Sequence, residues 1–133
     1  MASNLNTDGK VSEISVRDVV YLTIKQSVAR HDCMTVEDIS GTDVNCVWID
    51  ESLNLQRKVF MTRDLTNCDL ERSSPPLRSR VRPGSTVGLP SAGLNNGMVV
   101  ESIDGDLVAC AWNNARGLCC REGISIGMLE LLD

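Results

Sequence analysis

The chain has 133 residues, of which 42% are hydrophobic and 23% charged, and its formal net charge is −5. This balance excludes a disordered chain, and the net acidity argues against binding duplex nucleic acid through a broad basic face. No apolar run approaches the roughly 20 residues of a membrane span, and the polar start lacks the apolar core of a signal peptide. We therefore expect a cytoplasmic protein without a membrane anchor.

The strongest pattern is a repeat. The segment MTVEDISGTDVNCVW, Met34 to Trp48, occurs again without a gap as MVVESIDGDLVACAW, Met98 to Trp112, which is an offset of 64 residues. Self-similarity at a fixed offset indicates a duplicated structural unit. Because a unit of about 60 residues buries only about 60% of its unfolded surface, we expect the two halves to pack on each other, or on a partner chain in a homo-oligomer.

In chain order, polar residues 1–12 predict a tail. The first strand is expected at 19–22, where β-branched and aromatic residues favour a strand, with a counterpart at 86–89. Alternating apolar residues in each repeated segment then predict two strands joined as an antiparallel hairpin. The hairpin turns contain Gly41 and Gly105, and we expect a positive φ at both, which glycine adopts without steric cost.

Fourth strands are expected at 55–61 and 118–124, each followed by a turn or short helix, at 62–65 and 127–132. Small meanders of four or five strands usually curl into SH3-like barrels, which close their own edges. We therefore predict an all-β protein with two tandem SH3-like repeats. The predicted domains are a tail at 1–12, a first repeat at 13–66, a linker containing prolines at 67–82, and a second repeat at 83–133.

Three pieces of the first half, Asp18-Val19-Val20, Met34-Thr35-Val36 and Val44-x-Cys46-x-Trp48, resemble the YodC-like family of small bacterial and phage proteins. The resemblance covers most of residues 16–65 and, more weakly, residues 83–129. It implies an SH3-like β fold and no enzyme activity that transfers to this chain.

The chain also departs from the family pattern. Arg17 stands where the family tends to have a glycine before Asp-Val-Val, whereas the second half has Gly84. The loop after Leu22 lacks the family's short Ser-Gly-Gly turn. Family members are usually single copies, so the duplication implies a change of use.

Candidate reaction centres are few. His31-Asp32-Cys33 is the only place where an imidazole lies near a thiol and a carboxylate, and His31 would have to activate Cys33 as a nucleophile. Neighbours in a strand point to opposite faces, so a surface loop is the favoured interpretation. We predict no catalytic residue and no cofactor, with a thiol enzyme using Cys33 as an alternative.

The six cysteines are interpreted as reduced thiols, since no export signal accompanies them. Cys46 and Cys110 occupy the same position of the repeat, where a small hydrophobic residue would pack inside a strand. The adjacent Cys119 and Cys120 lack the spacing of structural zinc ligands, so no metal site is predicted.

Trp48 and Trp112 lie in phase with apolar neighbours and are interpreted as core, although aromatic residues can also form a stacking platform for a ligand.

Arg57 and Arg121 are matched charges in the fourth strands. They would either hold a small anion such as a nucleotide in both halves or protect an edge strand. Glu37 and Glu101 are also matched, and each could pair with the arginine of its own half. The linker supplies two further candidates for anion binding, Arg78 and Arg80.

The loop Thr23–Asp32 is longer and more charged than its counterpart Pro90–Asn96, and loops are where binding specificity usually resides. Its Lys25, Arg30 and His31 are the predicted partner-binding residues. The leading hypothesis is a non-enzymatic interaction protein of a bacterium or phage that binds a protein partner through loops. The alternative is a phage-encoded anti-defence inhibitor, or a sequestering protein that binds a host enzyme or nucleotide signal.

Overall fold

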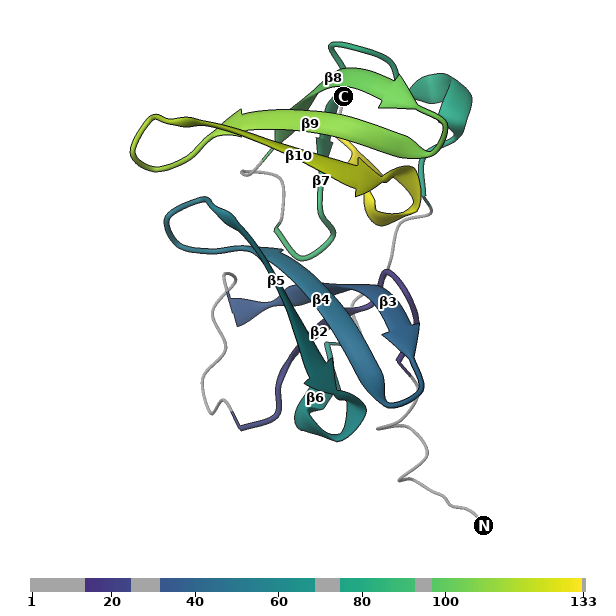
Figure 1. Ribbon diagram of the computed structural model, residues 1–133, viewed down its shortest axis with the longest axis vertical. Coiled ribbons are helices and arrows are strands. Elements are labelled where there is room, and N and C mark those ends of the chain that lie inside the picture. The colour runs from purple at the N-terminus through teal and green to yellow at the C-terminus, as the bar shows by residue number, and fades with distance from the viewer. Residues whose placement is uncertain (1–13, 25–31, 69–74, 93–96, 133) are drawn as a thin grey trace.

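The computed structural model describes residues 14–24, 32–68, 75–92 and 97–132. These ranges contain two five-stranded antiparallel sheets and short 3-10 turns, without an α-helix, so the predicted all-β class is confirmed. Figure 1 shows the two sheets one above the other. No described helix is long and apolar enough to cross a membrane.

The first sheet has the strand order β5-β4-β3-β2-β6. After β5 the chain makes a single 3-10 turn, η2 (Thr62–Asp64), before it returns beside β2. The strands are β2 (Val19–Leu22), β3 (Met34–Ser40), β4 (Asp43–Ile49), β5 (Leu55–Met61) and β6 (Leu65–Asn67).

The second sheet has the corresponding order β10-β9-β8-β7-β11. The turn η3 (Arg78–Arg80) precedes it, and η5 (Ile126–Met128) separates its last two strands. The strands are β7 (Thr86–Gly88), β8 (Met98–Asp104), β9 (Leu107–Asn113), β10 (Cys119–Ser125) and β11 (Glu130–Leu131).

The two sheets match in register as well as in order. Val36 pairs with Cys46 in the first sheet, and Val100 pairs with Cys110 in the second, 64 residues later. A register irregularity follows both pairs. Among the described strands, the hydrogen-bonded ladder of each sheet ends at β5 and β6 or at β10 and β11, so neither sheet closes on itself.

Both predicted hairpins are present, and Gly41 and Gly105 have φ values of +62° and +63°. A Cβ atom built on either glycine meets nothing within 4 Å, so the backbone conformation alone requires glycine there. A glycine at the first central position with positive φ is what a two-residue type II′ turn needs.

Most strand boundaries agree with the sequence prediction. β2 and β5 span the predicted residues, whereas β10 lies one residue later than the predicted 118–124. The short strands β6 and β11 are not predicted as strands: β11 lies within the predicted turn 127–132, whereas β6 begins at the end of the predicted turn 62–65 and its Asn67 falls in the predicted linker. They contain three and two residues, which is too few for an apolar period to be detected.

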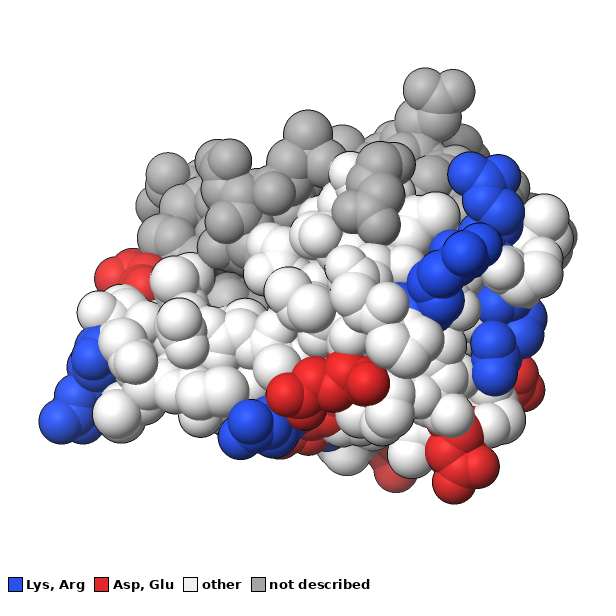
Figure 2. Space-filling model, turned by 90° about the horizontal axis from the view of Figure 1, so that it is seen from above, with Lys and Arg blue, Asp and Glu red and all other residues white. Residues whose placement is uncertain are grey.

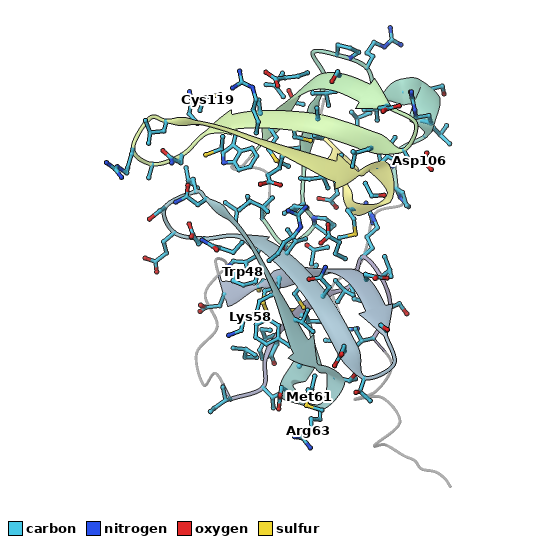
Figure 3. All side chains as sticks on the ribbon, in the orientation of Figure 1. Trp48, Lys58, Met61, Arg63, Asp106 and Cys119 are labelled. Carbon is cyan, nitrogen blue, oxygen red and sulfur yellow. The ribbon has the colours of Figure 1, made fainter. Side chains whose placement is uncertain are left out.

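Each sheet buries its inner face in its own core. In the first sheet this core includes Val36, Val44 and Cys46. Trp48 is half buried against it, with its ring centroid 6.4 Å from that of Phe60. In Figure 3, Trp48 lies near Lys58, the side chain whose Nζ is 5.5 Å from the centre of the Phe60 ring.

The core of the second sheet extends into the first half. It is built around Val100, Val108 and Cys110, yet Val47 and Ile49 of β4 belong to the same cluster. The expectation that the two halves pack on each other is therefore confirmed.

Candidate functional site

The outer face of a sheet is the face opposite to its own core, and the two halves are joined through the outer face of the first sheet. In the first sheet, this face carries Thr35, Val47 and Ile49, which are only 0 to 5% exposed. The Thr35 hydroxyl donates a hydrogen bond of 2.7 Å to Ser91 Oγ, and the Ser91 backbone N–H donates to Thr35 Oγ1 at 3.1 Å. The buried segment that follows β7 thus lies on the outer face of the first sheet.

Contacts between the tips of the two β-hairpins extend this interface. Trp112 Nε1 donates to the Leu53 carbonyl oxygen at 2.7 Å, and Asn114 Nδ2 donates to Asn54 Oδ1 at 3.0 Å. The Ala115 backbone N–H donates to the Ser52 carbonyl at 2.8 Å. Trp112, interpreted from the sequence as core, is half buried against the core of the second sheet, and its indole N–H joins the two halves.

Arg57 forms the charged edge of the interface. Its guanidinium donates to Glu37 of its own sheet at 3.0 Å and to Glu122 of β10 at 2.9 Å. The hydrogen bond to Glu37 is the largest cause that raises the pKa of Arg57 above its usual value, and Glu122 adds to it. Two carboxylates thus hold the guanidinium.

The equivalent outer face of the second sheet is open, and we call it the open face. Val99, the counterpart of Thr35, is 49% exposed, and Asn113, the counterpart of Ile49, is exposed. Arg121 pairs with Glu101 at 3.0 Å, as Arg57 does with Glu37, but no carboxylate of the other half reaches it among the described residues. The open face consists of Val99, Glu101, Ala111, Asn113, Cys119 and Arg121.

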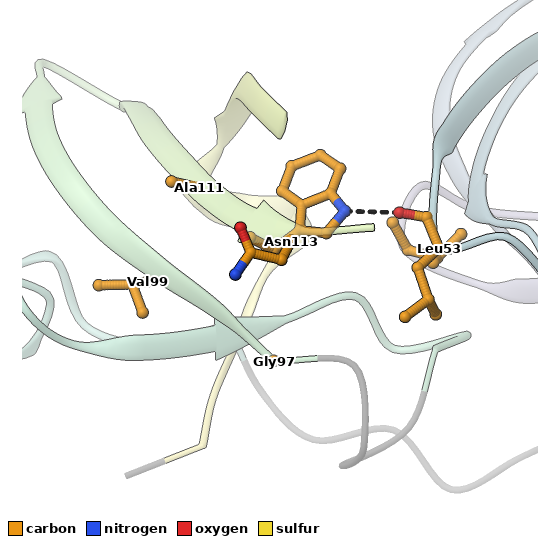
Figure 4. Close-up of a pocket in the computed structure, with 7 residues that line it drawn as sticks. Leu53, Gly97, Val99, Ala111 and Asn113 are labelled. Atoms are coloured by element: carbon orange, nitrogen blue, oxygen red, sulfur yellow. Dashed lines mark hydrogen bonds between the residues drawn. The ribbon is translucent and has the colours of Figure 1, made fainter. Parts of the chain in front are cut away.

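A pocket of about 280 Å³ lies where the open face meets the first half. Figure 4 labels Leu53, Gly97, Val99, Ala111 and Asn113 around it, and the hydrogen bond from Trp112 to Leu53 bridges the halves. Cofactor and ligand pockets usually have about 300–1,000 Å³, so this space suits one or two side chains. The lining residues are Ile49, Leu53, Gly97, Val99, Ala111, Trp112 and Asn113.

The arginines predicted to bind an anion lie in different surroundings. Arg57 is held by the two carboxylates, and Arg78 Nε donates to the Gly105 carbonyl at 3.0 Å. Arg80 is exposed on η3. Lys and Arg side chains gather in Figure 2 on the side of the molecule where η3 lies. Arg121 lies on the open face. Among the described residues, no two of these four guanidinium groups share a hydrogen-bond or ion-pair partner.

Other predicted residues are placed as follows. Lys25, Arg30 and His31 lie outside the described residues. Cys33 is half buried directly before β3, with its Sγ 4.0 Å from that of Cys68. In the described part of the chain, no group of three or more His, Cys, Asp or Glu side chains is arranged to hold a metal ion.

The residues that join the halves were not identified from the sequence, although a signal for them exists. Cys46 to Ile49 is an unbroken apolar run, which is typical of a strand buried on both faces. The second half has Asn113 in place of Ile49 and Ala111 in place of Val47. This difference at matched strand positions, rather than a difference in the loops, indicates which sheet has its outer face covered.

No protein-family model matches this chain, and no curated protein matches it.

Proposed function

We propose that this chain is a non-enzymatic interaction protein, of a bacterium or phage, that binds a protein partner. The observation that supports the proposal is the contrast between the two outer faces. Protein covers the face that carries Thr35, Val47 and Ile49, whereas the matched face around Val99 is exposed beside a side-chain-sized pocket. A partner that presents small and apolar side chains would bury the open face as the segment after β7 buries the first one.

We also propose that each sheet is one copy of a duplicated SH3-like unit, similar to the YodC-like family. The common strand order and the register pairs that differ by 64 residues support a duplication. In this proposal the outer face of the first copy packs against the second copy, and the outer face of the second copy stays free for binding.

Charge limits which partner can bind there. Suppose that the first half of a second copy covered the open face in the way that the second half covers the first sheet. Lys58 of that copy would then take the place of Glu122 opposite Arg121, because Lys58 and Glu122 are equivalent in register. The positive charges of Lys58 and Arg121 would then repel each other. The proposal therefore favours a different protein over a filament of this chain.

The test is capture of a partner by the purified full-length protein. The extract comes from the bacterium that encodes the chain, or from the host bacterium if a phage encodes it. The wild type is compared with Val99→Asp and with the matched control Val59→Asp. Val59 is also exposed, at 55% against 49% for Val99, and lies on the outer face of the first sheet away from the junction. Binding should be retained by the control and reduced at least tenfold by Val99→Asp.

A second variant tests the loop Thr23–Asp32, whose Lys25, Arg30 and His31 remain predicted partner-binding residues. The loop is replaced by the shorter Pro90–Asn96 sequence. Binding that survives Val99→Asp but not the loop exchange would place the site in the loop. A wild-type protein that retains a nucleotide and no protein would instead support the sequestering alternative.

A further inference from the structure

Cys33 and Cys68 lie 35 residues apart in the chain, yet their sulfur atoms are only 4.0 Å apart. Cys33 directly precedes β3, and Cys68 directly follows β6. Both strands pair with β2, where Val20 lies opposite Met34 on one side and opposite Asn67 on the other. Both cysteines are half buried rather than fully enclosed in the core.

The second sheet shows that the fold itself makes these two positions neighbours. Their counterparts, 64 residues later, are Gly97 before β8 and Leu132 after β11. A Cβ atom built on Gly97 would lie 3.5 Å from Leu132 Cδ1. The backbone anchors also match, since Cys68 N–H donates to the Val19 carbonyl and Leu132 N–H donates to the Thr86 carbonyl.

The two halves fill this shared space with different chemistry. The second half places a leucine against a glycine, whereas the first half places two thiols at the matched positions.

The remaining cysteines are poorly placed to compete. Cys46 and Cys110 are fully buried in the cores, where burial raises the pKa of each thiol and so reduces its reactivity. Cys119 and Cys120 are adjacent on β10, and neighbouring side chains of a strand point to opposite faces.

We propose that Cys33 and Cys68 are a redox modification site, a thiol pair that closes reversibly to a disulfide between the start of β3 and the end of β6. The oxidant is a small-molecule disulfide such as oxidised glutathione. One thiolate attacks it and forms a mixed disulfide with release of one glutathione thiolate. The second thiolate displaces the other glutathione, and the two protons of the cysteines pass to the two released thiolates. The sulfur atoms must approach from 4.0 Å to about 2 Å, which strand-terminal side chains allow.

The cross-link would restrict the unfolded chain by closing a loop between residues 33 and 68, which stabilises the folded protein. Oxidation should therefore raise the melting temperature by several degrees. The inference rests on the thiol geometry and is independent of the proposed function.

The experiment exposes reduced full-length protein to mixtures of oxidised and reduced glutathione under native conditions. Free thiols are then alkylated, and the disulfide-linked peptides are identified by mass spectrometry. We expect an intramolecular link between Cys33 and Cys68, a mass loss of about 2 Da, and a higher melting temperature that returns to its starting value on reduction.

The control is the double variant Cys33→Gly with Cys68→Leu, which copies the pair of the second half and should fold without being able to cross-link. Its melting temperature should not respond to oxidation, whereas a Cys119→Ser, Cys120→Ser variant should respond as the wild type does. Oxidation that yields only glutathionylated chains, dimers, or links through Cys119 or Cys120 would overturn the proposal. So would an equal thermal response of the double variant.

Discussion

At the scale of single residues, Arg17 shows how the two halves use one backbone position differently. Its φ is +79°, and its counterpart Gly84 has φ +95°. A residue with a side chain in this region costs about 1–2 kcal/mol. Arg17 is nevertheless only 6% exposed, and its Nη2 donates to the Leu129 carbonyl of the other half at 2.9 Å. The contact between the halves explains why the strained residue is tolerated.

Replacing Arg17 by glycine tests this balance. The substitution relieves about 1–2 kcal/mol of backbone strain but removes a buried hydrogen bond from a charged group, about 1.5–3 kcal/mol. Because the hydrogen bond is the larger of the two, the free energy of unfolding, measured with urea, should fall by about 1 kcal/mol. The control Gly84→Ala should also destabilise, through φ alone, because a Cβ there meets nothing within 4 Å. A stabilised Arg17→Gly protein would mean that strain outweighs the contact.

The buried thiols predict a pH dependence. Burial raises the pKa of Cys46 to about 12 and that of Cys110 to about 11, from a usual value of 9.0. Between pH 9 and pH 11 the unfolded chain loses protons that the folded protein keeps, so the free energy of unfolding falls as pH rises. Cys46→Ala should remove up to about 1.4 kcal/mol per pH unit from this decline. Urea titrations at pH 8, 9 and 10 measure it, and identical slopes in the variant would contradict the assignment.

At the scale of elements, the edge strands β5 and β10 carry a matched arginine, Arg57 and Arg121, in different roles. Both arginines pair with a glutamate of their own sheet, as the matched sequence positions predicted. Arg57 also reaches Glu122 across the interface, whereas Arg121 lies in solvent with its side chain 66% exposed. Exposed ion pairs contribute about 0–1 kcal/mol.

The pair therefore offers a matched comparison. Arg57→Gln should lower the free energy of unfolding by about 1–2 kcal/mol, because it leaves Glu37 and Glu122 close together without a cation. Arg121→Gln should change it by less than about 0.5 kcal/mol. Chemical denaturation with urea at low and high salt measures both, and the Arg57 effect should shrink as salt screens the charges. Equal effects of the two substitutions would contradict the interface role.

At the scale of the whole molecule, the shared core implies that the halves unfold together. Val47 and Ile49 are buried in the same cluster as Val100, Val108 and Cys110. Opening either half would expose this cluster. A chain of this size with one contiguous interface is expected to unfold in a single transition.

Single-tryptophan variants can test whether the two halves unfold in one transition. Trp112→Phe leaves Trp48 as a reporter of the first half, and Trp48→Phe leaves Trp112 as a reporter of the second, since the chain has two tryptophans. In each variant the fluorescence midpoint in urea should coincide with the midpoint from circular dichroism. Trp112→Phe should also be less stable by about 1 kcal/mol through loss of the bond to Leu53. Separate transitions for the two reporters would show independent halves.

The all-β class, the hairpins and the positive φ of Gly41 and Gly105 follow from the amino-acid sequence alone, because alternation and turn chemistry act between near neighbours in the chain. Which outer face is covered and which is open depends instead on contacts between segments far apart in the chain. Thr35 meets Ser91 across 56 residues, and Arg57 meets Glu122 across 65. An apolar pattern records that a side chain is buried and on which side of its strand it lies, but the surface that buries it comes from a distant segment.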